Sequence, residues 1–173
     1  LTSADLATLS ATDVAALSTA DVQALTNTQL KTLSGSVLSG MSTEQLNAIT
    51  TALVSNLTGA ALSALNSDQI QALNTSQINA LSSTQIKALS SYAVASLTTE
   101  QLNALGSSQF KLLSASQVGA LSTDQVAALT TTQVRGISVT QLQALSATDL
   151  GVLADRGAGV GSAVGFGIQS DRK

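Results

Sequence analysis

One eight-residue unit repeats along almost the whole chain, and this repeat limits what the chain can fold into. A leucine, isoleucine or methionine stands at every eighth residue from Leu1 to Leu153, and the unit reads L-[ST]-x-x-[QD]-[VIL]-x-A. Residues 81–88, LSSTQIKA, are one copy. We number the positions of this octad one to eight from the leucine. Because so much of the sequence is given to one small unit, little is left to build an irregular active site.

The second and fifth positions of the octad predict the start of a helix. Position two is Ser, Thr or Asn in 18 of the 19 octads, and position five is Gln or Asp in 15 of them. A Ser or Thr followed three residues later by Gln is typical of a capping box, which satisfies two backbone N–H groups at a helix start. The aliphatic residues at positions one and six then flank the first turn as a hydrophobic staple. The exceptions are Gly106 at position two and Val37, Leu53, Ala61 and Ala93 at position five.

Geometry argues against two simpler architectures. In a continuous α-helix, eight residues turn through about 800°, so a leucine stripe would drift by about 80° per octad. In a β-strand, positions one and six have opposite parity, so the two large aliphatic residues would lie on opposite faces of a sheet. A β-solenoid would need turn glycines and asparagines that do not recur in each octad. We therefore predict one short helix per octad, over positions three to eight.

A helix this short is not stable alone in water, so it needs stacked neighbours. The sequence therefore predicts an all-α solenoid over residues 1–153, in which short capped helices form the sides of a coil and leucines fill its axis. Three helices per coil, a triangular prism of 24 residues per turn, is the smallest closed polygon and is our working arrangement. Residues 26–73 also align with residues 82–129 at an offset of 56. Since 56 is not a multiple of 24, this duplication does not support the three-sided arrangement.

The octad pattern stops after Leu153, and residues 154–173 form a glycine-rich tail. We expect this tail to be a cap for the last coil, a linker or a docking segment. Its glycines do not match the dinucleotide-binding fingerprint, because Ser162 stands where the third glycine is required. The tail is also too short to span a bilayer.

Composition argues against several classes of function. The chain has no Cys and no His, so the soft and imidazole ligands of zinc, copper and iron are absent. Ten acidic residues outnumber seven basic ones, which disfavours nucleic acid and anionic membranes as partners. No apolar run approaches the length of a membrane span. Without Cys or His, and with each Ser assigned to the repeat, no catalytic set can be assembled. We expect no enzymatic activity and no cofactor.

The fifth position is the most tempting chemical feature of the repeat. Stacked glutamine amides are able to line a groove or bind a sugar, but a capping role already accounts for Gln at this spacing. Asp5, Asp13, Asp21 and Asp149 occupy the same position, so their capping role needs no metal ion. Calcium sites need several carboxylates within one short loop, and these acids stand eight or more residues apart.

Two segments resemble a known class of repeat. Residues 129–134, LTTTQV, and residues 121–129, LSTDQVAAL, are similar to the LTTxQVAAL arrays of very large bacterial surface or secreted proteins. Such proteins are often described as adhesin-like or haem-utilisation-like. The resemblance covers residues 1–153 and implies an extracellular or cell-surface location. It also implies a spacer, adhesive or filament-forming role, and it transfers no binding residue. The haem description has no support in a chain that lacks His.

These observations lead to two hypotheses of function. The first is a non-enzymatic structural protein, either a filament subunit that associates end to end or a segment of a surface stalk or adhesin. The second is a binding module that presents a regular Ser/Thr/Asn/Gln face to ice or to a polysaccharide such as a surface glycan. The chain starts within the repeat and without Met, which suggests a processed product or a fragment. The residues we expect at assembly contacts are Leu1, Leu6, Leu9, Leu150, Leu153, Val160, Val164, Phe166 and Ile168.

Overall fold

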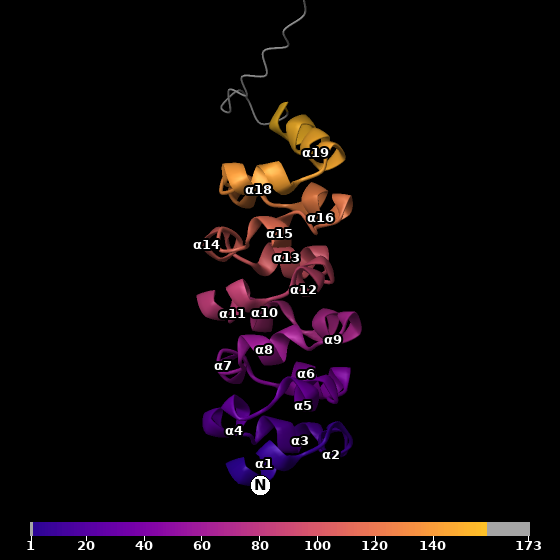
Figure 1. The fold of residues 1–173 in the computed structure, drawn as a ribbon, viewed down its shortest axis with the longest axis vertical. Helices are drawn as coiled ribbons and strands as arrows, with labels where there is room; N and C mark the ends of the chain where they lie inside the picture. The colour runs from indigo at the N-terminus through magenta and orange to yellow at the C-terminus, as the bar shows by residue number, and fades with distance from the viewer. Residues whose placement is uncertain (1, 159–173) are drawn as a thin grey trace, which may run out of the picture.

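The computed structural model describes residues 2–158, with side chains as far as Arg156. This span contains 19 helices and no strand, and the helices climb as a rod from the first octad to the last (Figure 1). The helices are α1 (Ser3–Thr8), α2 (Ala11–Ala15), α3 (Thr19–Gln23), α4 (Asn27–Lys31), α5 (Gly35–Ser39), α6 (Thr43–Ala48), α7 (Thr51–Val54), α8 (Gly59–Ser63), α9 (Ser67–Ala72), α10 (Thr75–Asn79), α11 (Ser83–Ala88), α12 (Ser91–Ala95), α13 (Thr99–Ala104), α14 (Ser107–Phe110), α15 (Ala115–Val118), α16 (Thr123–Ala128), α17 (Thr131–Val134), α18 (Val139–Ala144) and α19 (Ala147–Ala158).

Every one of these helices begins at position three of its octad, as the capping pattern predicted. At α6, Ser42 is extended (φ −71°, ψ 164°) and its Oγ accepts a hydrogen bond from the backbone N–H of Gln45. In return, the Ser42 N–H donates to Oε1 of Gln45 at 2.8 Å. Thr50 and Gly106 make no side-chain cap, yet their helices start at the same position. The octad therefore sets the start of each helix, and a missing cap hydrogen bond does not move it.

Each octad closes with a tight turn that redirects the chain. At the end of α6, the Ile49 N–H donates to the Leu46 carbonyl at 3.2 Å, three residues earlier. This is the 3₁₀ type of closure that is common at helix ends. Ile49 itself is extended (φ −63°, ψ 122°), and so is Thr50, the next N-cap. Two extended residues between successive helices thus form the corner of the coil.

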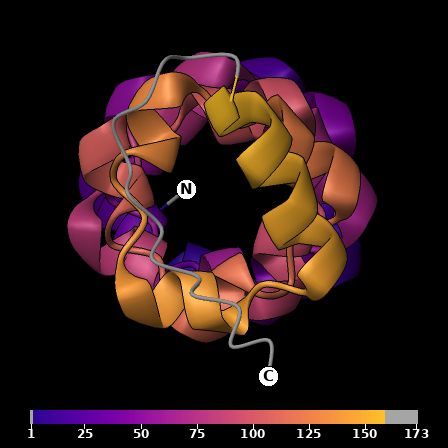
Figure 2. The ribbon, with the colours of Figure 1, turned by 90° about the horizontal axis from the view of Figure 1, so that it is seen from above.

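Successive turns stack so that each helix packs mainly on the third helix before and after it, as α6 does on α3 and α9. Seen along the rod axis, the helices form a ring (Figure 2). The all-α solenoid of short capped helices is therefore confirmed. Hydrogen bonds between turns join residues 25 to 31 positions apart, from Ser63–Ala88 to Gln77–Leu46. Each turn is accordingly longer than the 24 residues of a strict triangular prism, and helices of successive turns are staggered.

A single apolar core runs along the rod axis from Leu6 to Leu153. Positions one and six supply almost all of it, because both point inward from the corner and from the first helical turn. The largest fully buried side chain is that of Phe110, at position six of its octad. Position eight is usually Ala, which is small enough to let neighbouring turns approach.

The last helix departs from the octad rule. α19 runs for 12 residues, from Ala147 to Ala158, and passes through Leu153 without a break. Position two of the next octad is Ala154, which has no side-chain acceptor to cap a new helix. Residues 154–158 of the glycine-rich segment therefore continue a helix of the rod, and residues 159–173 lie outside the described residues.

Gly40 marks a point where two turns are too close for a side chain. A Cβ added there would lie 2.5 Å from Cα and 2.6 Å from the carbonyl oxygen of Ala11. Gly40→Ala should therefore lower the free energy of unfolding by about 1–3 kcal/mol, as overpacking does. Gly151→Ala, where a Cβ would meet nothing within 4 Å, should raise it by about 0.5–1 kcal/mol through helix propensity. Urea denaturation of both variants checks the pair, and a stabilising effect of Gly40→Ala would contradict this packing.

Candidate functional site

The glutamine at position five bonds each turn of the rod to the turn before it. In Gln77, Oε1 accepts from the Asn74 N–H at 2.8 Å, which completes the helix cap. Nε2 donates to the carbonyl of Ile49 at 2.6 Å and to that of Leu46 at 2.8 Å, 28 and 31 residues earlier. One amide thus caps its own helix with its oxygen and holds the preceding turn with its two N–H groups.

This arrangement recurs along most of the rod. In ten octads Nε2 donates to the position-one carbonyl 28 residues earlier, at 2.6–2.9 Å. Nine of the ten side chains are buried, and no buried side-chain nitrogen or oxygen in the described part of the chain lacks a hydrogen-bond partner. We call these residues the glutamine seam: Gln45, Gln69, Gln77, Gln85, Gln101, Gln109, Gln117, Gln125, Gln133 and Gln141.

The chemistry of the seam explains the choice of residue at position five. The site needs an acceptor for the N-cap N–H and two donors for carbonyls of the neighbouring turn, at the end of a side chain long enough to reach both. Asn is one methylene shorter, and glutamate at neutral pH only accepts hydrogen bonds. The capping role predicted from the sequence is confirmed. The donation to the preceding turn is a role that the sequence interpretation missed.

The aspartates that replace these glutamines lie at the two ends of the repeat. Asp5, Asp13 and Asp21 belong to the first three octads and Asp149 to the last complete one. All four carboxylates accept the N–H of their N-cap residue, as the Thr2 N–H donates to Asp5 at 2.7 Å. Their hydrogen bonds to the N-cap hydroxyl and N–H hold the pKa of each carboxyl below its usual value. The three N-terminal carboxylates are exposed, whereas Asp149 is buried.

At the C-terminal end, two side chains replace the seam by other bonds. Asp149 accepts at Oδ1 from the Thr123 hydroxyl of the preceding turn, at 2.9 Å. In α19, Arg156 donates from Nη1 to the carbonyls of Val126 and Ala127. These are backbone acceptors of the kind that a seam glutamine would bond. The last turn of the rod is therefore tied down by an aspartate and an arginine.

The lowered pKa values predict that acid weakens the fold. A carboxyl whose pKa is lower in the folded than in the unfolded chain contributes stability above its unfolded pKa, and this contribution is lost as the pH falls through the folded value. Because the chain has no His, the melting temperature should be nearly constant between about pH 5 and 8 and should fall below about pH 4. Asp149→Asn should flatten this acid dependence, which thermal melts followed by circular dichroism would measure. A melting temperature that rises on acidification below pH 4 would contradict these shifts.

The residues expected at assembly contacts fall into different environments. Leu6 and Leu153 are buried in the core of the chain, and Leu9 is partly buried against it. Leu150 remains 38% exposed, as does much of Val139 and Tyr92. Leu1, Val160, Val164, Phe166 and Ile168 lie outside the described residues.

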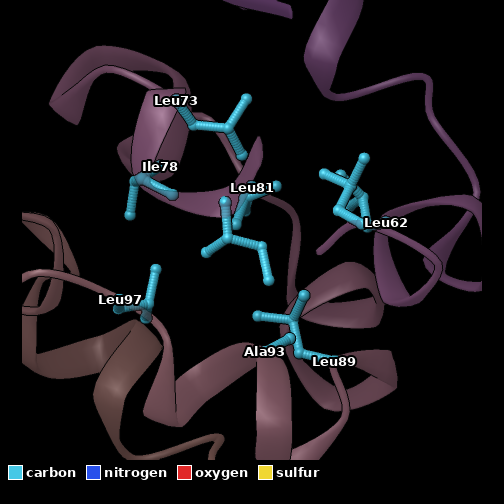
Figure 3. A pocket seen from close by; sticks show the side chains of 9 residues that line it. Leu62, Leu73, Ile78, Leu81, Leu89, Ala93 and Leu97 are labelled. Atoms are coloured by element: carbon cyan, nitrogen blue, oxygen red, sulfur yellow. The ribbon is translucent and has the colours of Figure 1, made fainter. Parts of the chain in front are cut away.

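The described part of the rod offers few other places for a ligand. A cavity of about 20 Å³ lies in the core between α8 and α12 and is lined by Leu62, Leu73, Ala93 and other aliphatic side chains (Figure 3). It has room for about one water molecule and no polar lining to hold it. Among residues 2–158, acidic side chains do not gather into a group that would hold a metal ion. None of the helices described is both long and apolar enough to cross a membrane.

Comparison with known proteins identifies the repeat. The family model of the ALTTAQ repeat matches residues 56–83, 80–114 and 94–131, three overlapping segments in the middle of the rod. The chain therefore contains ALTTAQ repeats. No curated protein and no solved structure matches it.

Proposed function

We propose that this chain is a non-enzymatic structural rod that serves as a spacer, in a stalk or adhesin at a bacterial cell surface. The observation that carries this proposal is the glutamine seam. From Gln45 to Gln141 it ties nearly every turn to the one before it, through buried hydrogen bonds that run along the rod axis. Such bonds resist separation of the turns. A spacer needs this property, because it must hold its two ends at a fixed distance.

The surface location rests on the resemblance of the octads to arrays in bacterial surface and secreted proteins. It is tested on intact cells with a membrane-impermeant amine reagent, for which the exposed Lys87 is a target. Labelling of Lys87 before lysis is the expected result. Labelling that occurs only after lysis would refute the location.

The spacer role is tested by changing the length of the rod and its surface separately. Deletion of residues 73–128 removes seven whole octads and joins Ala72 to Leu129 in phase. It should shorten the rod in small-angle scattering and bring a C-terminal epitope closer to the envelope in electron tomography. The control replaces the exposed Thr75, Ser76 and Thr84 by alanine, which should change neither distance.

The same variants distinguish the spacer from a binding module for ice or a surface glycan. A spacer depends on length and tolerates the alanine variant. Retention on polysaccharide or thermal hysteresis, if present in the native chain and lost in the alanine variant, would replace the spacer by a binding module. Most glutamines of such a face would have to come from position seven, as Gln71 does, because the seam glutamines are buried.

A further inference from the structure

The first turn of the rod carries aspartate at position five in all three of its octads. Asp5, Asp13 and Asp21 each use Oδ2 to accept the N-cap N–H, at 2.7, 2.9 and 3.0 Å. Their side chains are exposed, so Oδ1 of each faces solvent. In later octads the same position bears the glutamine amide that bonds the preceding turn.

The direction of the seam gives these aspartates a meaning. Every seam glutamine donates toward the N-terminal end of the rod, from its own turn to residues 28 to 31 positions earlier. The three aspartates therefore occupy the place from which the first turn would bond to a turn beneath it. A carboxylate has no hydrogen to donate, and the lowered pKa of these carboxyls keeps them charged at neutral pH.

The opposite end of the rod presents acceptors as well. The carbonyls of Ile137 and Leu145 hold the position-one place that ten other octads use to receive a seam amide. They receive no glutamine within residues 2–158. If a second copy stacked its first turn on this end, carboxylates would face carbonyl oxygens. Juxtaposed acceptors without donors oppose association.

A carboxylate at position five is tolerated between turns only where a donor meets it. Asp149 has such a donor in Thr123, at position three of an octad in the preceding turn. The position-three residues of the last three octads are Thr131, Val139 and Ala147, and only the first has a hydroxyl. In any pairing of the three aspartates with these octads, at least two carboxylates lack a hydroxyl donor. No Lys or Arg precedes Lys31 to offset the charge within the first turn.

From this pattern we propose that the aspartate turn, residues 2–24, is a stop that prevents a second copy of the chain from stacking end to end against it. The seam needs donors on the N-terminal side of every turn, and the first turn has replaced all of them by charged acceptors. Protein surfaces that could pair with copies of themselves are often protected in this way by charge. The proposal concerns self-association and holds whether or not the rod is a spacer.

The test replaces the three acceptors by donors. The triple variant Asp5→Gln, Asp13→Gln, Asp21→Gln keeps the caps, because Gln forms the same capping box in Gln45 and its equivalents. Sedimentation velocity over a range of concentrations should find the native chain monomeric. The triple variant should associate about tenfold more tightly for each aspartate replaced, since each exchange removes an unpaired acceptor and adds hydrogen bonds. Small-angle scattering should show particles that grow in length and keep their width.

The matched control removes the same three charges elsewhere. Glu44→Gln, Asp68→Asn and Asp124→Asn change exposed residues at position four and should leave the chain monomeric. Association of this control as strong as that of the triple variant would overturn the proposal in favour of net charge. A native chain that assembles through its first turn, or a triple variant that folds by circular dichroism and stays monomeric, would overturn it too. If the triple variant does not fold, Asp13→Gln alone is measured and should associate about tenfold more tightly than the native chain.

Discussion

Gln77→Glu should lower the free energy of unfolding by about 3–5 kcal/mol, the size of effect expected when an unpaired charge is left in a buried site. The substitution changes one nitrogen to oxygen and keeps the shape of the side chain. The cap still receives its acceptor, but the carbonyls of Leu46 and Ile49 now face a carboxylate in place of two N–H groups. Gln77 is fully buried, so water cannot restore the lost bonds without opening the turn. Urea denaturation followed by circular dichroism measures the loss.

Gln71→Glu is the matched control, since it makes the same chemical change at an exposed position seven, six residues away. Its effect should stay within about 0.5 kcal/mol, as for other surface substitutions. Equal effects of the two substitutions would mean that the seam bonds contribute nothing beyond helix capping and net charge.

Phe110→Ala should lower the free energy of unfolding by about 3–5 kcal/mol, because a large buried ring is lost and the core closes over the cavity only in part. Phe110 has no exposed surface, and its octad-mates at position six are smaller aliphatic residues. The control is Val139→Ala: Val139 is 71% exposed, so the change should stay within about 0.5 kcal/mol. Denaturant titrations of both variants test the assignment. A near-neutral Phe110→Ala would show that this ring does not lie in a packed core.

The local structure was predictable from the sequence because it depends on neighbours within one octad. The N-cap at Ser42 and the acceptor in Gln45 are three residues apart, so their partnership follows from spacing alone. The same holds for burial at positions one and six. At the last octad the rule also works in reverse, since Ala154 cannot cap a helix and α19 continues through Leu153.

The relation between turns was harder to predict, because it depends on contacts about 28 residues apart. The capping box already accounted for Gln at position five, so nothing in one octad required a second role for its amide. A signal was nevertheless present in the position of the exceptions. Asp occupies the fifth position at the two ends of the repeat, where the seam is absent or is replaced by Thr123 and Arg156.

The 56-residue duplication carried a second signal about the turn. It did not agree with 24 residues per turn, but it is twice the 28-residue spacing that joins Gln77 to Ile49. Residues 56 apart, such as Lys31 and Lys87, therefore differ by two such steps along the seam. A block of seven octads can be duplicated without changing which carbonyl each glutamine meets, and this explains why the array tolerates a period that is not a multiple of three octads.

The most direct test of the seam is hydrogen exchange of the glutamine side-chain amides, followed by NMR on the folded chain. Each N–H of Gln69, Gln77, Gln85, Gln101 and Gln133 is bonded to a backbone carbonyl of the preceding turn or is buried beside it. Their exchange should be far slower than that of the exposed Gln23, Gln71 and Gln143. Equally fast exchange for both groups in a folded, helical chain would contradict a rod whose turns are held together by these amides.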